Sequence, residues 1–276
     1  MPSRSAPTAE LRAFLRGSLR RGSMVAKRAA RDNLSYLARV RGPVAAFHSD
    51  AYLRLNHRRQ EHLATLGLAL ENRTVLEVGA GIGDHTAFFL DRGARVTITD
   101  GRAKHVALVA RRFPDQEARV LDLEQPDPTV PDHDIVYCYG LLYHLSDPAA
   151  AIGYLAARCR EAMLVETCVS PGPGEALNPT REARWNPTQA TAGGCRPTRL
   201  WVWNRLAESF PHVYATTTQP WHEEFPTDWT APASASGSAS GSAFGATLTR
   251  AVFVASRRAL ELPSLTTELP VVQARR

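Results

Sequence analysis

The chain has 276 residues, of which 44% are hydrophobic and 22% charged, a balance typical of a folded domain with a buried core. It holds no run of about eighteen apolar residues, and its first residues lack the apolar core and the small-residue cleavage site of a secretory signal. We therefore expect neither a membrane span nor export. The net charge of +6 is uneven, because residues 1–60 carry thirteen Arg or Lys against three acids. Such a segment suits either a solvated helical face or binding to nucleic acid or anionic lipid.

Two helices are predicted ahead of the first strand. Apolar residues recur at helical spacing over residues 11–40, and a second helical stretch runs over 49–66 until Gly67 ends it. Strands and helices then alternate. The predicted strands are 74–78, 96–99, 118–123, 135–139 and 163–167, and the predicted helices are 84–93, 102–113 and one opened by Ser146-Asp147-Pro148. This alternation predicts a doubly wound α/β fold, a parallel sheet with helices on both faces.

The regular alternation stops after the fifth strand. Residues 170–196 are rich in Pro, Gly and Asn, and a helix is predicted over 198–210. Two further strands are predicted near 213–218 and 249–255, separated by a loop with the sequence HEEFPTDW and an Ala-Ser-Gly tract over 231–246. The four cysteines, at positions 138, 159, 168 and 195, show no CxxC spacing. Buried reduced thiols in a cytoplasmic protein are the prediction.

The strongest motif follows the first strand directly and opens a helix. Its sequence is Glu77-Val78-Gly79-Ala80-Gly81-Ile82-Gly83-Asp84. Glycines allow a tight turn and close approach of the backbone to a ligand, and a helix N-terminus offers free N–H groups. Dinucleotide oxidoreductases prefer GxGxxG, whereas this chain has GxGxG, so the spacing disfavours an NAD-dependent enzyme.

Two carboxylates end the next two strands. Asp100 closes the second strand, where a carboxylate can accept both hydroxyl hydrogens of a ribose. Asp122 closes the third strand in Leu121-Asp122-Leu123, where it can accept from the amine of an adenine while Leu123 packs on the ring. Parallel sheets bind ligands at these strand ends, so the sequence predicts one adenosine-containing ligand there.

Through VLEVGAGIGDHT, TITD, LDLE and DIVYCYGLLYHLSDP, the chain resembles the class I S-adenosylmethionine-dependent methyltransferases over about residues 50–170. The resemblance implies S-adenosylmethionine as cofactor and an antiparallel hairpin, here 212–218 and 249–256, ending the sheet. It also implies a set of cofactor-binding residues: Gly79, Gly81 and Gly83 at the methionyl part, Asp100 at the ribose, Asp122 and Leu123 at the adenine, and Tyr139 and Gly140 beside the sulfonium. Glu77, Ala80 and Gly101 are further expected cofactor-binding residues. The C-terminal third is similar to that of uncharacterised bacterial members and indicates no acceptor.

With this resemblance the chain divides into three parts. We expect a basic helical extension over residues 1–48, a methyltransferase domain over 49–257 and a tail over 258–276. Within the domain, residues 170–247 would hold the lid over the acceptor. In this superfamily the helices before the sheet often close over the cofactor. Tyr52, Asn56, Arg59 and His62 share one helix face, from which Arg59 would meet the methionyl carboxylate.

Three residues are candidates for the chemistry on the acceptor. His144 follows the fourth strand, and a histidine can take a proton near neutral pH. Glu166 ends the fifth strand, where it would orient the acceptor or His144. His222 lies in His222-Glu223-Glu224 among aromatic residues that would line a polar acceptor pocket. Each of these side chains also has a purely structural interpretation, and adjacent His-Glu-Glu is poor metal-ligand spacing, so no metal is expected.

The leading hypothesis is methyl transfer to a small polar metabolite or sugar-like acceptor, with O-methylation favoured over N-methylation. The second is a tRNA-modifying methyltransferase. LLYHLSDP and LVET are similar to segments of the enzymes that finish wobble-uridine oxyacetate groups, and the basic N-terminal segment would contact phosphates. No named RNA-binding motif is present, so nucleic acid is not favoured as a partner. The third is a binding protein that kept the cofactor fold without catalysis.

Overall fold

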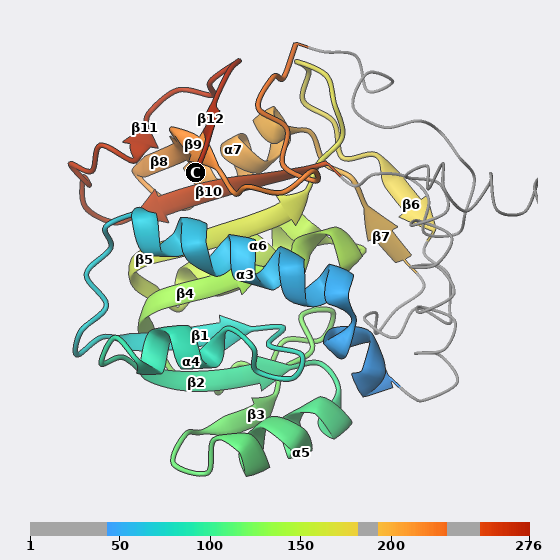
Figure 1. The fold of residues 1–276 in the computed structure, drawn as a ribbon, viewed down its shortest axis with the longest axis vertical. Coiled ribbons are helices and arrows are strands. Elements are labelled where there is room, and N and C mark those ends of the chain that lie inside the picture. Colours follow the sequence, from blue (N-terminus) through green and yellow to red (C-terminus); the bar gives the residue numbers. More distant parts are fainter. Residues whose placement is uncertain (1–42, 182–192, 231–248) are drawn as a thin grey trace, which may run out of the picture.

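The computed structural model describes residues 43–181, 193–230 and 249–276. The helix predicted over 11–40 and the Ala-Ser-Gly tract lie outside these residues. The centre of the molecule is an eight-stranded sheet with the order β11-β8-β10-β5-β4-β1-β2-β3 (Figure 1). Its strands are β1 (Thr74–Val78), β2 (Arg95–Asp100), β3 (Ala118–Val120), β4 (His133–Tyr139), β5 (Cys159–Cys168), β8 (His212–Thr216), β10 (Arg250–Ser256) and β11 (Leu265–Thr266).

The five strands from β1 to β5 pair in parallel, and the other strands of the large sheet, β8, β10 and β11, pair antiparallel. β10 lies between β5 and β8 and is antiparallel to both. The predicted hairpin of residues 212–218 and 249–256 is therefore present, and the predicted fold class is confirmed. Two small sheets accompany the large one, formed by β6 (Pro179–Arg181) with β7 (Gly193–Cys195), and by β9 (Thr218–Gln219) with β12 (Ala274–Arg275).

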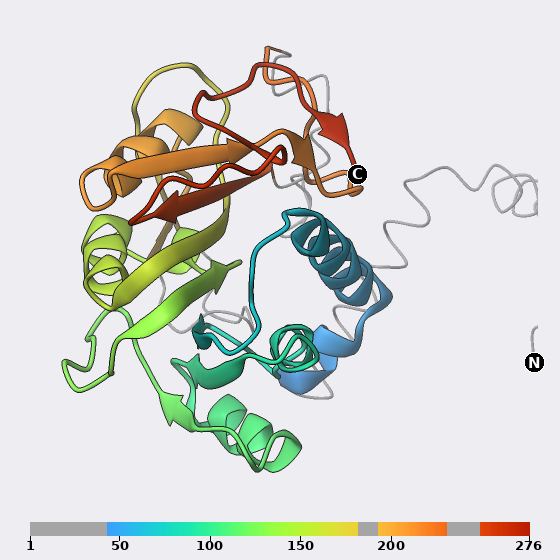
Figure 2. The same cartoon turned by 90° about the vertical axis from the view of Figure 1, so that its left-hand side faces the viewer.

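Helices cover both faces of the large sheet (Figure 2). Their bounds are α3 (Asp50–Thr65), α4 (Thr86–Leu90), α5 (Ala103–Arg112), α6 (Pro148–Ala157) and α7 (Arg199–Ala207), with two 3-10 turns, η1 (Pro43–His48) and η2 (Leu142–His144). One apolar cluster joins the sheet to α3, α4 and α5, and the other joins it to α6 and α7. The sheet is buried on both sides, as the apolar strand sequences predict.

Capping residues begin three of these helices. The Ser49 side chain accepts from Tyr52 N at the start of α3, and Asp147 accepts from Ala150 N at the start of α6, where Pro148 holds the first turn. Thr198 accepts from Trp201 N and starts α7. Gly67 takes a positive φ of 76° just after α3 and ends it as predicted.

The predicted start of α4 at Asp84 is wrong, because the helix begins at Thr86. The Asp84 carboxylate binds Arg112 at 2.9 Å and lies 3.5 Å from Asn56 Nδ2, so it does not cap the helix. The small β6–β7 sheet was not predicted, and β11 extends the large sheet into the segment expected as a tail.

All four cysteines are buried and free of disulfides. Among the helices that the structure describes, none has the length and apolar character needed to cross a membrane.

Candidate functional site

The glycine motif forms a tight loop between β1 and α4. Gly81 has a φ of +60°, and a Cβ atom at this position would lie 2.8 Å from the Phe47 ring of η1. A larger residue would therefore be strained in its backbone and would displace Phe47. Gly79 and Gly83 also have positive φ. Gly81 and Gly83 are packed against neighbouring side chains, and of the three glycines Gly79 lines both pockets described below.

Asp100 fixes the loop to the end of β2. Its Oδ2 atom accepts from Gly81 N at 2.9 Å, and its Oδ1 atom accepts from Arg102 N at 2.9 Å. His105 Nδ1 lies 3.3 Å from the same Oδ1 atom. Burial raises the pKa of Asp100, but the neighbouring His105 and Arg102 outweigh it and hold the pKa below its usual range. The side chain is therefore an ionised acceptor at neutral pH.

Glu77 lies under the same loop and is fully enclosed. Thr86 Oγ1 donates to its Oε2 atom at 2.5 Å. Burial raises the pKa of Glu77 to about 8, and the hydrogen bond from Thr86 opposes this shift only in part. Glu77 thus carries a proton through most of the neutral range.

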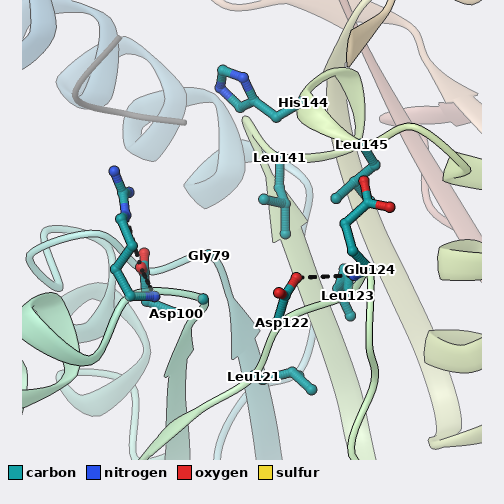
Figure 3. Close-up of a pocket in the computed structure, with 11 residues that line it drawn as sticks. Gly79, Asp100, Leu121, Asp122, Leu123, Glu124, Leu141, His144 and Leu145 are labelled. Carbon is teal, nitrogen blue, oxygen red and sulfur yellow. Dashed lines mark hydrogen bonds and ion pairs between the residues drawn. The ribbon is translucent and has the colours of Figure 1, made fainter. Parts of the chain in front are cut away.

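A first pocket opens beside the loop at the carboxyl ends of the strands. Of the predicted residues it is lined by Gly79, Asp100, Gly101, Asp122, Leu123 and His144. Arg102, Leu121, Glu124, Leu141 and Leu145 complete its wall and were not predicted. In Figure 3, Gly79 lies between Asp100 and Asp122, and His144 and Leu121 lie at opposite ends of the pocket.

A second pocket lies on the other side of Gly79, beneath α3. Its lining includes Glu77 and Ala80 from the loop, Tyr139 from β4, and Tyr52, Asn56 and Arg59 from α3. Three residues of the shared helix face therefore line this pocket, whereas the fourth, His62, contacts the Thr218 carbonyl instead. Two buried polar atoms here have no hydrogen-bond partner, the Arg59 Nε and the Tyr139 hydroxyl. Buried polar atoms are normally paired, so these two are suited to a ligand that brings an acceptor.

Gly140 brings Arg59 close to the end of β4. Its φ is +73°, and a Cβ atom there would lie 3.1 Å from Arg59 Nη2. Only a residue without a side chain accommodates both this conformation and this contact. Gly140 N also donates to the Glu166 carbonyl at 2.9 Å, which joins the ends of β4 and β5.

Glu166 is completely buried, and both of its oxygens bind arginines. Oε2 accepts from Arg59 Nη2 at 2.6 Å, and Oε1 accepts from Arg250 Nη1 at 3.0 Å. Arg250 was not predicted, because it follows Glu166 by 84 residues and joins it only through the pairing of β10 with β5.

His222 lies outside the lining of both pockets. Its Nδ1 atom accepts from Glu224 N at 3.2 Å, and burial lowers its pKa. Among the described residues, no cluster of three or more His, Cys, Asp or Glu side chains could hold a metal ion.

An α/β sheet with a glycine loop at β1 and an acid after each of the next two strands defines a protein that binds an adenosine-containing cofactor. Comparisons with known proteins narrow this class. Residues 76–162 match a family model described as a methyltransferase domain. No curated protein matches the chain.

Several solved methyltransferases share the fold. The N-terminal domain of EvdMO1, in the presence of S-adenosylhomocysteine and D-fucose, is 20% identical with a TM-score of 0.52, over 74% of this chain and 83% of that one. An S-adenosylmethionine-dependent methyltransferase from Mesorhizobium loti is 17% identical with a TM-score of 0.51, over 72% and 98%. Magnesium protoporphyrin IX methyltransferase from Synechocystis PCC 6803 is 15% identical with a TM-score of 0.50, over 84% and 100%.

Residues 76–162 therefore belong to a methyltransferase domain, and the chain has the fold of S-adenosylmethionine-dependent methyltransferases, so the cofactor that these findings imply is S-adenosylmethionine. The site fits this molecule on three observations. The two pockets meet at Gly79 of the glycine loop, Asp100 and Asp122 both line the first pocket, and the second pocket holds two buried polar atoms without partners.

Proposed function

We propose that the chain methylates an oxygen atom of a small polar, sugar-like acceptor, with His144 as the base. S-adenosylmethionine supplies a methyl group already activated on a sulfonium. The protein must then align the acceptor with this methyl group and remove the proton of the acceptor. The observation that carries the proposal is that His144 lines the cofactor pocket, at the end opposite Leu121 (Figure 3).

The two pockets support a division of the cofactor into two ends. Asp100 and Gly101 would bind the ribose, and Asp122 with Leu123 the adenine, since all four line the first pocket. Glu77, Ala80, Arg59 and Tyr139 line the second pocket and would surround the methionyl end, with the Arg59 Nε donating to its carboxylate. Gly79 borders both pockets and Gly140 lies against Arg59, so the sulfonium would lie near these two glycines.

The other two candidate catalytic residues suit supporting roles better. Both oxygens of Glu166 bind arginines, so we propose that Glu166 positions Arg59. His222 accepts a backbone hydrogen bond, and its segment is bound to α3 and β10. We therefore propose that His222 supports the wall of the acceptor site. His144 then remains as the base. A sugar-like acceptor is favoured by the polar residues of segment 170–230, and the fucose named with EvdMO1 suggests which compounds to test first.

The test is transfer of labelled methyl from S-adenosylmethionine to a panel of deoxysugars and other small hydroxylated acceptors, with His144→Ala beside the unaltered chain. A lost base should lower kcat by about 100-fold or more and leave the affinity for S-adenosylhomocysteine unchanged. His57→Ala, an exposed histidine on α3, is the matched control.

Full activity of His144→Ala on an acceptor would exclude His144 as the base. Methylation of tRNA but of no small molecule would overturn the sugar-like acceptor in favour of a nucleic acid. Cofactor binding with no transfer to any acceptor would favour a protein without catalysis.

A further inference from the structure

Six charged side chains, three arginines and three glutamates, link α3, β5, β10 and the segment after β9, and one of them, Arg59, lines the second pocket. Arg54 on α3 binds Glu223, and the adjacent Glu224 Oε2 accepts from Arg250 Nε at 2.5 Å. Arg250 Nη1 donates to Glu166 Oε1 at 3.0 Å, and Arg59 Nη2 donates to Glu166 Oε2 at 2.6 Å. Because Arg54 and Arg59 belong to the same helix, the chain of contacts closes on itself. We call these six residues the charged circuit.

The inner part of the charged circuit is buried far more deeply than the outer part. Side-chain exposure is 6% for Arg59, 0% for Glu166 and 4% for Arg250, against 40% for Arg54 and 48% for Glu223. Exposed ion pairs contribute little, whereas losing one partner of a buried pair leaves an uncompensated charge. The interactions that matter are therefore those of Glu166 with its two arginines.

Arg250 occupies one oxygen of the Glu166 carboxylate and so leaves only the other oxygen to Arg59. Each guanidinium takes one carboxylate oxygen, so Arg59 binds Glu166 through Nη2 and still donates from Nη1 to Asn56 Oδ1 at 3.2 Å. Its Nε has no partner. A lone arginine facing a buried carboxylate prefers to bind both oxygens with two parallel hydrogen bonds. Without Arg250, Arg59 would turn to this arrangement, and Glu166 would cancel more of its charge.

We infer that Arg250 is a positioning residue that, by binding one oxygen of Glu166, keeps the Arg59 guanidinium oriented toward the methionyl end of the cofactor. The inference rests on the proposed role of Arg59 at the methionyl carboxylate. Arg250 itself does not line either pocket. Arg250 also contacts Glu224 and the Tyr143 ring, but only its contact with Glu166 leads to Arg59 and the second pocket, so it should affect the methionyl end of the cofactor more than the adenosine end.

Two ligands distinguish binding at the methionyl end of the cofactor site from binding at the adenosine end. S-adenosylhomocysteine carries the amino and carboxylate groups, whereas 5'-methylthioadenosine carries the adenosine and sulfur without them. In Arg250→Gln, the affinity for S-adenosylhomocysteine should fall at least about tenfold, and the affinity for methylthioadenosine should stay the same. Arg250→Lys, which keeps a charge beside Glu166, should recover part of the loss. Isothermal titration measures all four affinities.

Two further variants show whether the effect belongs to Arg250. Glu224→Gln breaks the outer contact of Arg250 but leaves it on Glu166, so the preference for S-adenosylhomocysteine should persist. Arg205→Gln removes an ion pair of similar length on α7, the 3.0 Å contact with Glu175, and should change neither affinity. Thermal unfolding checks each variant, and if Arg250→Gln does not fold, the comparison is made with Arg250→Lys.

Equal loss of both affinities in the Arg250 variants would make Arg250 a merely structural residue and overturn the inference. So would full retention of both. Equal binding of the two ligands by the unaltered chain would instead remove the proposed role of Arg59, and the inference with it, without touching the assignment of His144.

Discussion

The Asp100 carboxylate forms a hydrogen bond with the glycine loop, and Asp100 also lines the first pocket. The carboxylate accepts hydrogen bonds from Gly81 N and Arg102 N, and the residue is only 3% exposed. Asp100→Ala should lower the affinity for S-adenosylhomocysteine by at least about tenfold, since both the loop anchor and the proposed ribose acceptor disappear. Isothermal titration measures the loss, with NAD as a ligand that neither chain should bind.

Asp115→Ala is the matched control, because Asp115 is an exposed aspartate beyond the end of α5. Unchanged affinity in Asp100→Ala would show that the ribose binds elsewhere and would reopen the assignment of the first pocket.

The residues that sequence reasoning could predict are those in or beside a continuous motif. Gly79, Asp100 and Asp122 each follow a strand, so their positions at one edge of the sheet were predictable. Arg59 was accessible through helical spacing, because α3 places it on one face with Tyr52 and Asn56. No sequence motif indicated Arg250, because its ion pair with Glu166 depends on the register of two strands that are far apart in the sequence.

The helix α3 is fastened to the C-terminal part of the chain by a buried histidine. His62 Nε2 donates to the Thr218 carbonyl at 2.9 Å, while its Nδ1 has no partner. Burial lowers the pKa of His62 to about 4, and the hydrogen bond to Thr218 opposes this shift only in part. The folded chain therefore keeps His62 neutral where the unfolded chain would already protonate it.

This difference predicts an acid-sensitive contribution of α3 to stability. The contribution is complete above the unfolded pKa of 6.5 and is lost as the pH falls toward 4. His62→Gln, which can still donate to Thr218, removes the titrating group. The stability of the unaltered chain relative to this variant should therefore decrease between about pH 7 and about pH 5. Urea unfolding at several pH values measures it, and a constant difference would contradict a buried neutral His62.

Element positions were predicted best where local chemistry decides them. β1 spans the predicted residues 74–78, and Asp147 caps α6 beside Pro148 as expected. The predicted strand 118–123 is shorter in the structure, where β3 ends at Val120, and β5 is longer than predicted because it pairs with a strand on each side. Pairing partners thus set strand lengths that propensity alone does not determine.

At the scale of the whole molecule, the parallel half of the sheet has the doubly wound order β3-β2-β1-β4-β5, which local strand-and-helix units predict, whereas the order of the antiparallel half follows from no local unit. Every alternation from β1 to β5 is local, so the sequence pattern was sufficient to predict the fold class. The last strands cross back instead, with β10 inserted between β5 and β8 and β11 added outside β8. No pattern within these short segments specifies that order.

The central place of β10 has a consequence for biosynthesis. β8 is joined to β5 only through β10, so until residues 250–256 have been translated, β5 is an open edge. The nascent chain would then expose the unpaired backbone of the apolar run Met163-Leu164-Val165, which favours association with other chains. A message truncated after codon 249 should yield insoluble protein, whereas the full message yields soluble enzyme, as fractionation of expressing cells would show. A soluble product of the short message that binds S-adenosylhomocysteine would mean that the β5 edge needs no cover.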